Sequence, residues 1–130
     1  MQNKNLKEIR TGDAPAPVGP YSQAIAVDRF VFCSGQVALD PKSGNMVGKT
    51  AEEQAVQVMD NMKNVLSAAG CSLHDIIKTT IFLKDLSSFA AVNAIYEKKL
   101  EGHKPARSTV EVSRLPKEAL VEIECIALKN

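Results

Sequence analysis

An arginine and two glutamates near the end of the chain are the residues best suited to do chemistry. Arg107 stands just ahead of a strand-like run, and a second such run carries Glu122 and Glu124. Arginine stays charged and offers a planar fork of N–H donors that fits a carboxylate. A glutamate between Val121 and Ile123 is partly shielded from water, so it is kept where something pairs with it or uses it. The pattern favours either an anion-binding pocket that handles a proton or a water, or a salt bridge between strands.

The composition indicates one globular domain over residues 1–130. Hydrophobic residues make up 45% of the chain, enough for a core, and the formal net charge is +1. A net charge near zero argues against a nucleic-acid partner. The few aromatic residues, four Phe, two Tyr and no Trp, also argue against a surface on which bases would stack. No apolar run reaches the length of a membrane span, so no membrane partner is expected. The polar start MQNKNLKEIR is unlike a signal peptide.

The three cysteines indicate a reducing compartment. Cys33, Cys71 and Cys125 are far apart in the sequence and form no C-x-x-C pair, and their odd number fits reduced thiols. Cys33 and Cys125 lie inside apolar runs, which favours small core residues over redox chemistry. We therefore expect a cytoplasmic protein.

Hydrophobic periodicity divides the chain into two helices and a set of strands. Thr50 and Glu53 predict a capping box at the start of a helix that Gly70 ends. A second helix is expected over 89–100, and its apolar positions are Phe89, Val92, Ile95, Tyr96 and Leu100. Strands are expected over 21–27, 30–37, 76–83, 108–112 and 120–128.

This order of elements predicts an α+β domain in which two helices cover one face of a sheet of about six strands. Both faces of that sheet are expected to be apolar, although two helices can cover only one. The opposed sets are Val121, Ile123, Cys125 and Ala127 against Leu120, Glu122, Glu124, Ile126 and Leu128, and Ile77, Ile81 and Leu83 against Ile76 and Phe82. A second copy of the chain would cover the other face, so the pattern predicts a homo-oligomer.

Three other places could contribute to a site, and each also has a structural explanation. Tyr21 follows the rigid Gly19-Pro20 turn, where it could face a ligand or pack at the start of a strand. The step over 33–36, Cys-Ser-Gly-Gln, suits the close approach of a ligand or a β-bulge. Asn93 lies beside the apolar stripe of the second helix and could be a buried polar anchor or a ligand contact.

Other chemistries fit the sequence poorly. His74 and His103 have no cysteine or carboxylate at ligand spacing, so no metal site is expected. Ser108 has no G-x-S-x-G elbow around it, and the glycines lack phosphate-loop spacing.

The chain strongly resembles the RidA/YjgF family of reactive-intermediate deaminases. The resemblance runs from about Asp13 to Leu128 and rests on four segments: GPYSQA, CSGQVALDPKSG, KTTIFLKDLSSFAAVNAIYE and PARSTVEVSRLPKEALVEIECIAL. It implies a single-domain, chorismate-mutase-like α+β fold with a mixed sheet. It also implies a homotrimer, with strands packed at its centre and active sites in the clefts between subunits.

The resemblance implies hydrolysis of 2-imino acids and their enamines, chiefly 2-iminobutanoate and 2-iminopropanoate, to 2-oxo acids and ammonia. Arg107 would grip the substrate carboxylate, and Glu122 would position a water. Ser108 and Thr109 would line the carboxylate site. Thr109 departs from members that carry cysteine here, so no thiol chemistry is assigned to it. The further pocket residues implied are Tyr21, Ser34 and Asn93, and no metal or organic cofactor is needed.

A rival interpretation is a non-catalytic regulatory or protein-interaction role, because the family carries older labels such as translation inhibitor and ribonuclease. Arg107 and Glu122 favour the enzyme, since a scaffold has no need for a carboxylate clamp beside a water-directing acid. The sequence leaves open the preferred imine and which subunit contributes each residue of the cleft.

Overall fold

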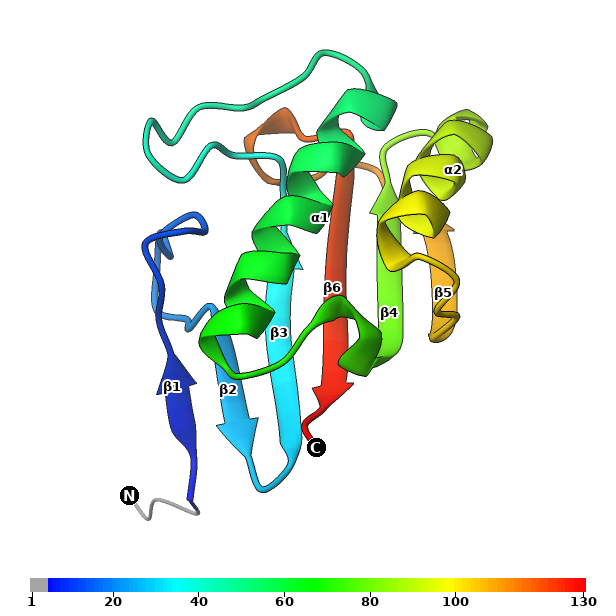
Figure 1. The fold of residues 1–130 in the computed structure, drawn as a ribbon. Helices are drawn as coiled ribbons and strands as arrows, with labels where there is room; N and C mark the ends of the chain where they lie inside the picture. Colours follow the sequence, from blue (N-terminus) through cyan, green and yellow to red (C-terminus); the bar gives the residue numbers. More distant parts are fainter. Residues whose placement is uncertain (1–4) are drawn as a thin grey trace.

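Within residues 5–130, six strands form one mixed sheet, and two α-helices lie on the same face of it (Figure 1). The computed structural model describes residues 5–130, so the first four residues of the polar start lie outside the described residues. The elements are β1 (Lys7–Ile9), β2 (Ala24–Val27), β3 (Phe30–Gln36), α1 (Ala51–Ala68), β4 (Ile76–Leu83), α2 (Phe89–Leu100), β5 (Ala106–Glu111) and β6 (Val121–Leu128). The strand order is β1-β2-β3-β6-β4-β5. The β4–β5 pair is parallel and the other pairs of these strands are antiparallel.

Helix α1 begins at the capping box that the sequence predicts. Thr50 Oγ1 accepts a hydrogen bond from the Glu53 N–H at 3.1 Å, and Glu53 Oε1 accepts one from the Thr50 N–H at 3.2 Å. These bonds satisfy donors that the first turn would otherwise leave free. Gly70 follows the helix with a φ of 80°, a left-handed conformation that favours glycine. The buried face of α1 packs on β3 and β6.

Helix α2 has the predicted bounds and covers the β4–β5 side of the sheet (Figure 1). It buries Val92, Tyr96 and Leu100. It ends at Leu100 because Glu101 adopts a left-handed conformation, with a φ of 50°. Within residues 5–130, no helix is both long and apolar enough to cross a bilayer.

Three strand predictions need correction. The strand expected over 21–27 begins only at Ala24, where backbone pairing with β1 and β3 begins. The Gln23 side chain before it bonds carbonyl oxygens of the loop over 11–15. The strand expected over 108–112 spans Ala106–Glu111, so Arg107 lies within β5 rather than ahead of it. The short strand β1 had no predicted counterpart, because its three residues are mostly polar and exposed.

The two-faced sheet is confirmed in β6 and corrected in β4. Alternate residues of β6 are buried, and those between them are partly or fully exposed. In β4 the register shifts between Ile76 and Lys78, which places Ile76 on the buried face and leaves Ile77 exposed. The prediction grouped Ile77 with Ile81 and Leu83 and was wrong, because a bulge reverses the alternation at that point.

The sheet face opposite α1 and α2, called here the helix-free face, exposes apolar side chains. Phe32 is 44% exposed, and Ile77 and Val110 are each 42% exposed. The rings of Phe30 and Phe32 lie with their centroids 6.1 Å apart. Exposed apolar area of this kind usually marks an interaction surface.

Candidate active site

Glu122 lies on the helix-free face of β6, beside a bulge in β3. Between Cys33 and Gln36 the register shifts, so that Ser34 and Gly35 together face a single residue of β6. A β-carbon on Gly35 would overlap Glu122 Oε2 and would lie 2.8 Å from its Cδ. The glycine therefore leaves the space that the carboxylate occupies. The sequence left a bulge or a close approach open at this step, and the structure has a bulge that admits Glu122.

Ser34 holds the loop that precedes β2. Its hydroxyl donates a hydrogen bond to the Ser22 carbonyl oxygen at 2.6 Å. Its backbone N–H donates to the Gln23 carbonyl oxygen at 2.9 Å. Both bonds fix the bulge against the segment that carries Tyr21, so Ser34 positions other residues at the same time as it lines the site.

A cavity of about 360 Å³ opens beside Glu122 and is also lined by Tyr21 and Ser34. Tyr21 lies in the loop before β2, where its hydroxyl oxygen accepts a hydrogen bond from the Val18 N–H at 3.4 Å. The exposed ring faces this cavity rather than packing at the start of a strand. The apolar walls of the cavity are Pro15, Ala16, Val18, Val37, Leu39 and Pro116.

The environment of Glu122 favours its protonated form. Burial raises the pKa of this carboxyl group, and the negative charge of Glu124 raises it further. A carboxyl group with a raised pKa exchanges protons closer to neutral pH, as a general acid or base requires. Glu124 is exposed on the same side of the strand, and no basic group within residues 5–130 pairs with it.

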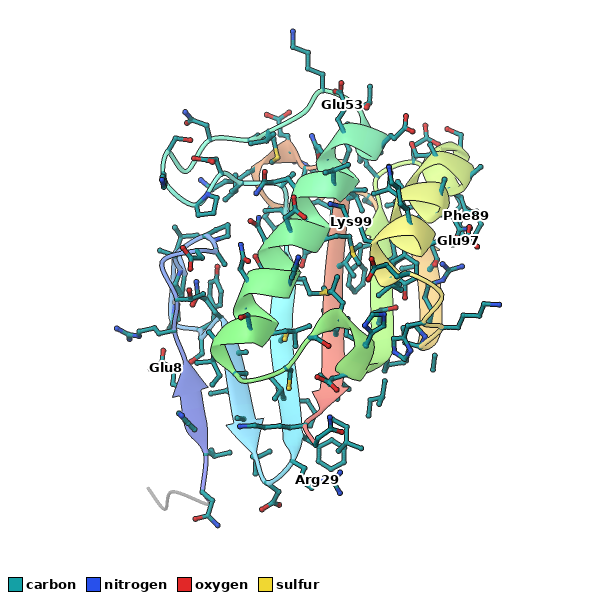
Figure 2. The ribbon with its side chains drawn as sticks, in the orientation of Figure 1. Glu8, Arg29, Glu53, Phe89, Glu97 and Lys99 are labelled. Atoms are coloured by element: carbon teal, nitrogen blue, oxygen red, sulfur yellow. The ribbon has the colours of Figure 1, made fainter. Side chains whose placement is uncertain are left out.

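Arg107 lies on β5 and contacts helix α2. It is next to Thr79 in the parallel β4–β5 pair. Its Nη1 donates a hydrogen bond to Asn93 Oδ1 at 2.6 Å. Its Cζ lies 5.4 Å from the ring centroid of Phe89, which Figure 2 labels on α2, and 5.2 Å from that of Tyr96. Both distances are within the range of cation–π contacts. The guanidinium therefore points to the helix-covered side of the sheet.

Ser108 and Thr109 follow Arg107 on opposite faces of β5. Ser108 Oγ accepts a hydrogen bond from Lys78 Nζ at 3.3 Å. Thr109 Oγ1 is buried and has no hydrogen-bond partner within residues 5–130. Thr109 and Arg107 line a narrow crevice beneath α2. A buried hydroxyl without a hydrogen-bond partner is unfavourable, so a ligand that bonds Thr109 Oγ1 would remove this cost. Thr109 is therefore a better candidate for the carboxylate site than Ser108.

One chain therefore holds two separate groups of candidate site residues, called here the half-sites. The first joins Glu122 with Ser34 and Tyr21, and the second joins Arg107 with Asn93. Strand β4 separates β6 from β5, a lateral distance of about 10 Å, and the two charged groups lie on opposite faces. The salt bridge that the sequence left open does not form in one chain.

Comparison with known proteins assigns the chain to a family. The family model described as Endoribonuclease L-PSP matches residues 11–129. The chain belongs to this family. It is the RidA/YjgF family that the sequence motifs indicate, since the crystal structure of the Escherichia coli YjgF gene product superposes with a TM-score of 0.91. That structure is 46% identical to the RidA/YjgF chain described here, and the match covers 95% of this chain and 99% of that one.

Two curated relatives of this RidA/YjgF chain are similar over nearly their whole length. A RutC family protein of Synechocystis is 54% identical over 125 residues, covering 95% of this chain and 96% of the relative. A 2-iminobutanoate/2-iminopropanoate deaminase of Salmonella typhimurium is 48% identical, covering 95% of this chain and 98% of the relative. The α+β fold predicted from the sequence is confirmed by the structure and by the YjgF match.

Phe89 and Tyr96 are residues near the half-sites whose part the sequence did not reveal. In the sequence pattern, Phe89 and Tyr96 are only apolar positions of the second helix. Their spacing with Asn93 nevertheless places Phe89, Asn93 and Tyr96 on one face of that helix. The alternation of β5 alone could not show that Arg107 leans onto that face. The sequence indicated a close approach or a bulge at the step that contains Gly35, but it could not show that Glu122 of a neighbouring strand occupies the space there.

The histidines and cysteines take structural positions. Among residues 5–130, no group of three or more His, Cys, Asp or Glu side chains could hold a metal ion. The rings of His74 and His103 lie edge to face with centroids 5.9 Å apart. Cys33 and Cys125 are free, buried and opposite each other in the β3–β6 pair. A hydrogen bond with Cys33, together with burial, raises the pKa of the Cys125 thiol, which disfavours a reactive thiolate at Cys125.

Proposed function

We propose that this protein hydrolyses 2-imino acids, chiefly 2-iminobutanoate and 2-iminopropanoate, to 2-oxo acids and ammonia. Relatives from mouse, human and Salmonella are named for this activity, which supports the proposal. The observation that carries it is the pairing of two features, an arginine with donors left for a carboxylate and a partly buried glutamate with a raised pKa. We place the enzyme in the cytoplasm, where the three thiols would stay reduced.

The active sites are proposed to lie between the subunits of a homotrimer. The two half-sites face opposite sides of one sheet, so a complete site takes Arg107 and Asn93 from one subunit and Glu122, Ser34 and Tyr21 from its neighbour. The exposed apolar side chains of the helix-free face support this assembly, because contact with a second copy would remove them from water. Closed rotational symmetry would then repeat the same contact around the centre.

In this site, Arg107 would bind the substrate carboxylate through two parallel N–H bonds. That grip fixes the position of the adjacent C=N carbon. Glu122 would accept a hydrogen bond from a water molecule and direct its oxygen at this carbon. The carbon–oxygen bond forms as the C=N electron pair moves to nitrogen.

Proton transfer completes the reaction. Glu122 takes a proton from the attacking water and returns one to the nitrogen, and its raised pKa suits both steps. This gives an intermediate with a hydroxyl and an amino group on the same carbon. Glu122 then passes the hydroxyl proton to the amino nitrogen as the carbon–nitrogen bond breaks, so ammonia leaves and the carbon becomes the carbonyl of the 2-oxo acid. The substrate carbon is already electrophilic, so the proposal requires no metal or organic cofactor.

RNA cleavage is a second candidate, because the family model carries the description endoribonuclease. A net charge of +1 and few aromatic residues give this candidate little support. A regulatory role without turnover is the third. Neither role needs the Arg107 and Glu122 half-sites.

A coupled assay separates these candidates. A threonine or serine dehydratase supplies the imine, and semicarbazide traps whatever escapes hydrolysis. The protein should reduce semicarbazone formation and accelerate release of the 2-oxo acid, while the same preparation leaves a labelled RNA intact. Light scattering should give three times the 14.1 kDa chain mass. Unchanged trapping, or RNA cleavage that survives in Arg107→Lys, would overturn the proposal.

A further inference from the structure

We propose that Tyr96, held in place by Thr79, is a positioning residue that orients the Arg107 guanidinium for its carboxylate ligand. The inference rests on the proposed function for the identity of that ligand. The orientation of the guanidinium itself is a property of the protein alone, so it can be measured without substrate.

Three side chains of α2 surround the guanidinium. Phe89, Asn93 and Tyr96 lie on one face of the helix, at spacings that bring side chains one above the other. The two rings lie within cation–π distance of Arg107 Cζ, and Asn93 accepts the hydrogen bond from Nη1. Together these contacts fix the tilt of the guanidinium plane and its rotation within that plane.

Tyr96 is the firmly held member of this set. It is 6% exposed, whereas Phe89 is 39% exposed. The Tyr96 hydroxyl lies 2.7 Å from Thr79 Oγ1, and Thr79 is fully buried. Thr79 is also next to Arg107 in the β4–β5 register, so the same strand pair anchors the ring and carries the arginine. Burial raises the pKa of the Tyr96 phenol, which keeps the ring neutral beside the cation.

This arrangement leaves donors free for a ligand. Within residues 5–130, Asn93 accepts from Nη1 and no hydrogen bond occupies Nε or Nη2. Those two groups form a fork that matches a carboxylate. An arginine on an exposed edge strand would otherwise lose much rotamer freedom when it binds. Contacts that already restrict the side chain reduce that cost and strengthen binding.

The first test measures the order of the Arg107 side chain by NMR. The Nε–H signal, assigned through its loss in Arg107→Lys, should show a restricted bond vector in the parent protein. In Tyr96→Leu the order parameter should fall below about 0.6, the range of flexible groups. Tyr96→Phe keeps the ring but loses the hydroxyl that bonds Thr79, so its order parameter should lie between those of the parent and Tyr96→Leu. An order parameter unchanged in Tyr96→Leu, or already low in the parent, would overturn the inference.

The second test uses kinetics with 2-iminobutanoate. Tyr96→Leu should raise KM roughly tenfold and change kcat by no more than about twofold, because carboxylate binding is weakened while Glu122 is untouched. Val65→Ala is the matched control, since it truncates a fully buried side chain on α1 away from Arg107. It should lower thermal stability without moving KM or the order parameter. If both variants raise KM equally, the role of Tyr96 is only structural.

Two further outcomes are informative. If Tyr96→Leu does not fold, Thr79→Val replaces it, because this change removes the hydroxyl anchor while preserving the shape of the side chain. Thr79→Val should then give an intermediate loss of Arg107 order, and no loss would contradict the inference. If Arg107 becomes mobile in these variants but the parent turns over no imine, the positioning role is supported and the proposed function fails.

Discussion

Arg107 and Glu122 lie on opposite faces of one sheet, with strand β4 between the strands that carry them. Arg107 is drawn onto α2 by Asn93 and two aromatic rings. Glu122 is directed the other way, into the space left by Gly35. A reaction that needs both residues therefore needs two copies of the chain.

Replacing Arg107 with lysine should remove most deaminase activity although the charge is kept. Lysine is a point donor, so it cannot reproduce the planar two-bond grip or the contact with Asn93. The loss should cost about 2–4 kcal/mol of transition-state binding, a hundredfold or more in kcat/KM. Steady-state kinetics with 2-iminobutanoate measure it. Parent-like turnover by Arg107→Lys would show that the carboxylate is bound elsewhere.

Glu122→Gln should lower kcat strongly, because the amide keeps the shape of the side chain but cannot take a proton from water. Glu124→Gln is the matched control, two residues along the same strand and about 7 Å away. It should keep most of the turnover in a folded protein. The opposite ranking of the two variants would mean that Glu124 is the catalytic carboxylate.

Gly35→Ala should lower kcat by displacing the Glu122 carboxylate. The new β-carbon meets the far end of a flexible side chain, so Glu122 can rotate away and the fold should survive. Gly12→Ala is a fitting control, because a β-carbon there meets nothing within 4 Å. Kinetics and thermal melts of both variants provide the comparison. If Gly35→Ala remains fully active, the observed position of the carboxylate is not the catalytic one.

The pH dependence should report the raised pKa of Glu122. As a base, Glu122 must be ionised, so kcat should fall on acidification at a pH above the ordinary glutamate value of 4.5. Glu124→Gln removes the nearby negative charge and should move this acid limb to lower pH. If the acid limb stays at the same pH in Glu124→Gln, the charge of Glu124 does not raise the pKa of the catalytic group, and the prediction is wrong.

The same raised pKa affects stability. A carboxyl group whose pKa is higher in the folded state stabilises the protein below the unfolded-state pKa, and that contribution is lost as the pH rises through the folded-state value. Glu122→Gln should therefore raise the melting temperature at neutral pH, and the gain should vanish in acid. Melts across this range test the sign, and a Glu122→Gln protein less stable than the parent at neutral pH would contradict it.

Local patterns in the sequence predicted the helices well, because a capping box and an apolar stripe are set by neighbouring residues. The capping pair of Thr50 and Glu53 is an example. Features that depend on a second strand were harder to predict. The bulge at Ile76 changes which residues of β4 face the helices. The space at Gly35 can be assigned to Glu122 only once β6 is known to lie beside β3. The family motifs indicated the candidate site residues, but only the sheet topology shows that Arg107 and Glu122 cannot meet in one chain.

Subunit complementation tests the shared active site most directly. Arg107→Lys and Glu122→Gln proteins, each inactive alone, are unfolded together in equal amounts and refolded as mixed oligomers. Sites that take Arg107 from one subunit and Glu122 from its neighbour should recover about a quarter of the parent activity, as random assembly of a closed ring requires. If mixed oligomers form but stay as inactive as the two separate variants, each site lies within a single chain and the account is wrong.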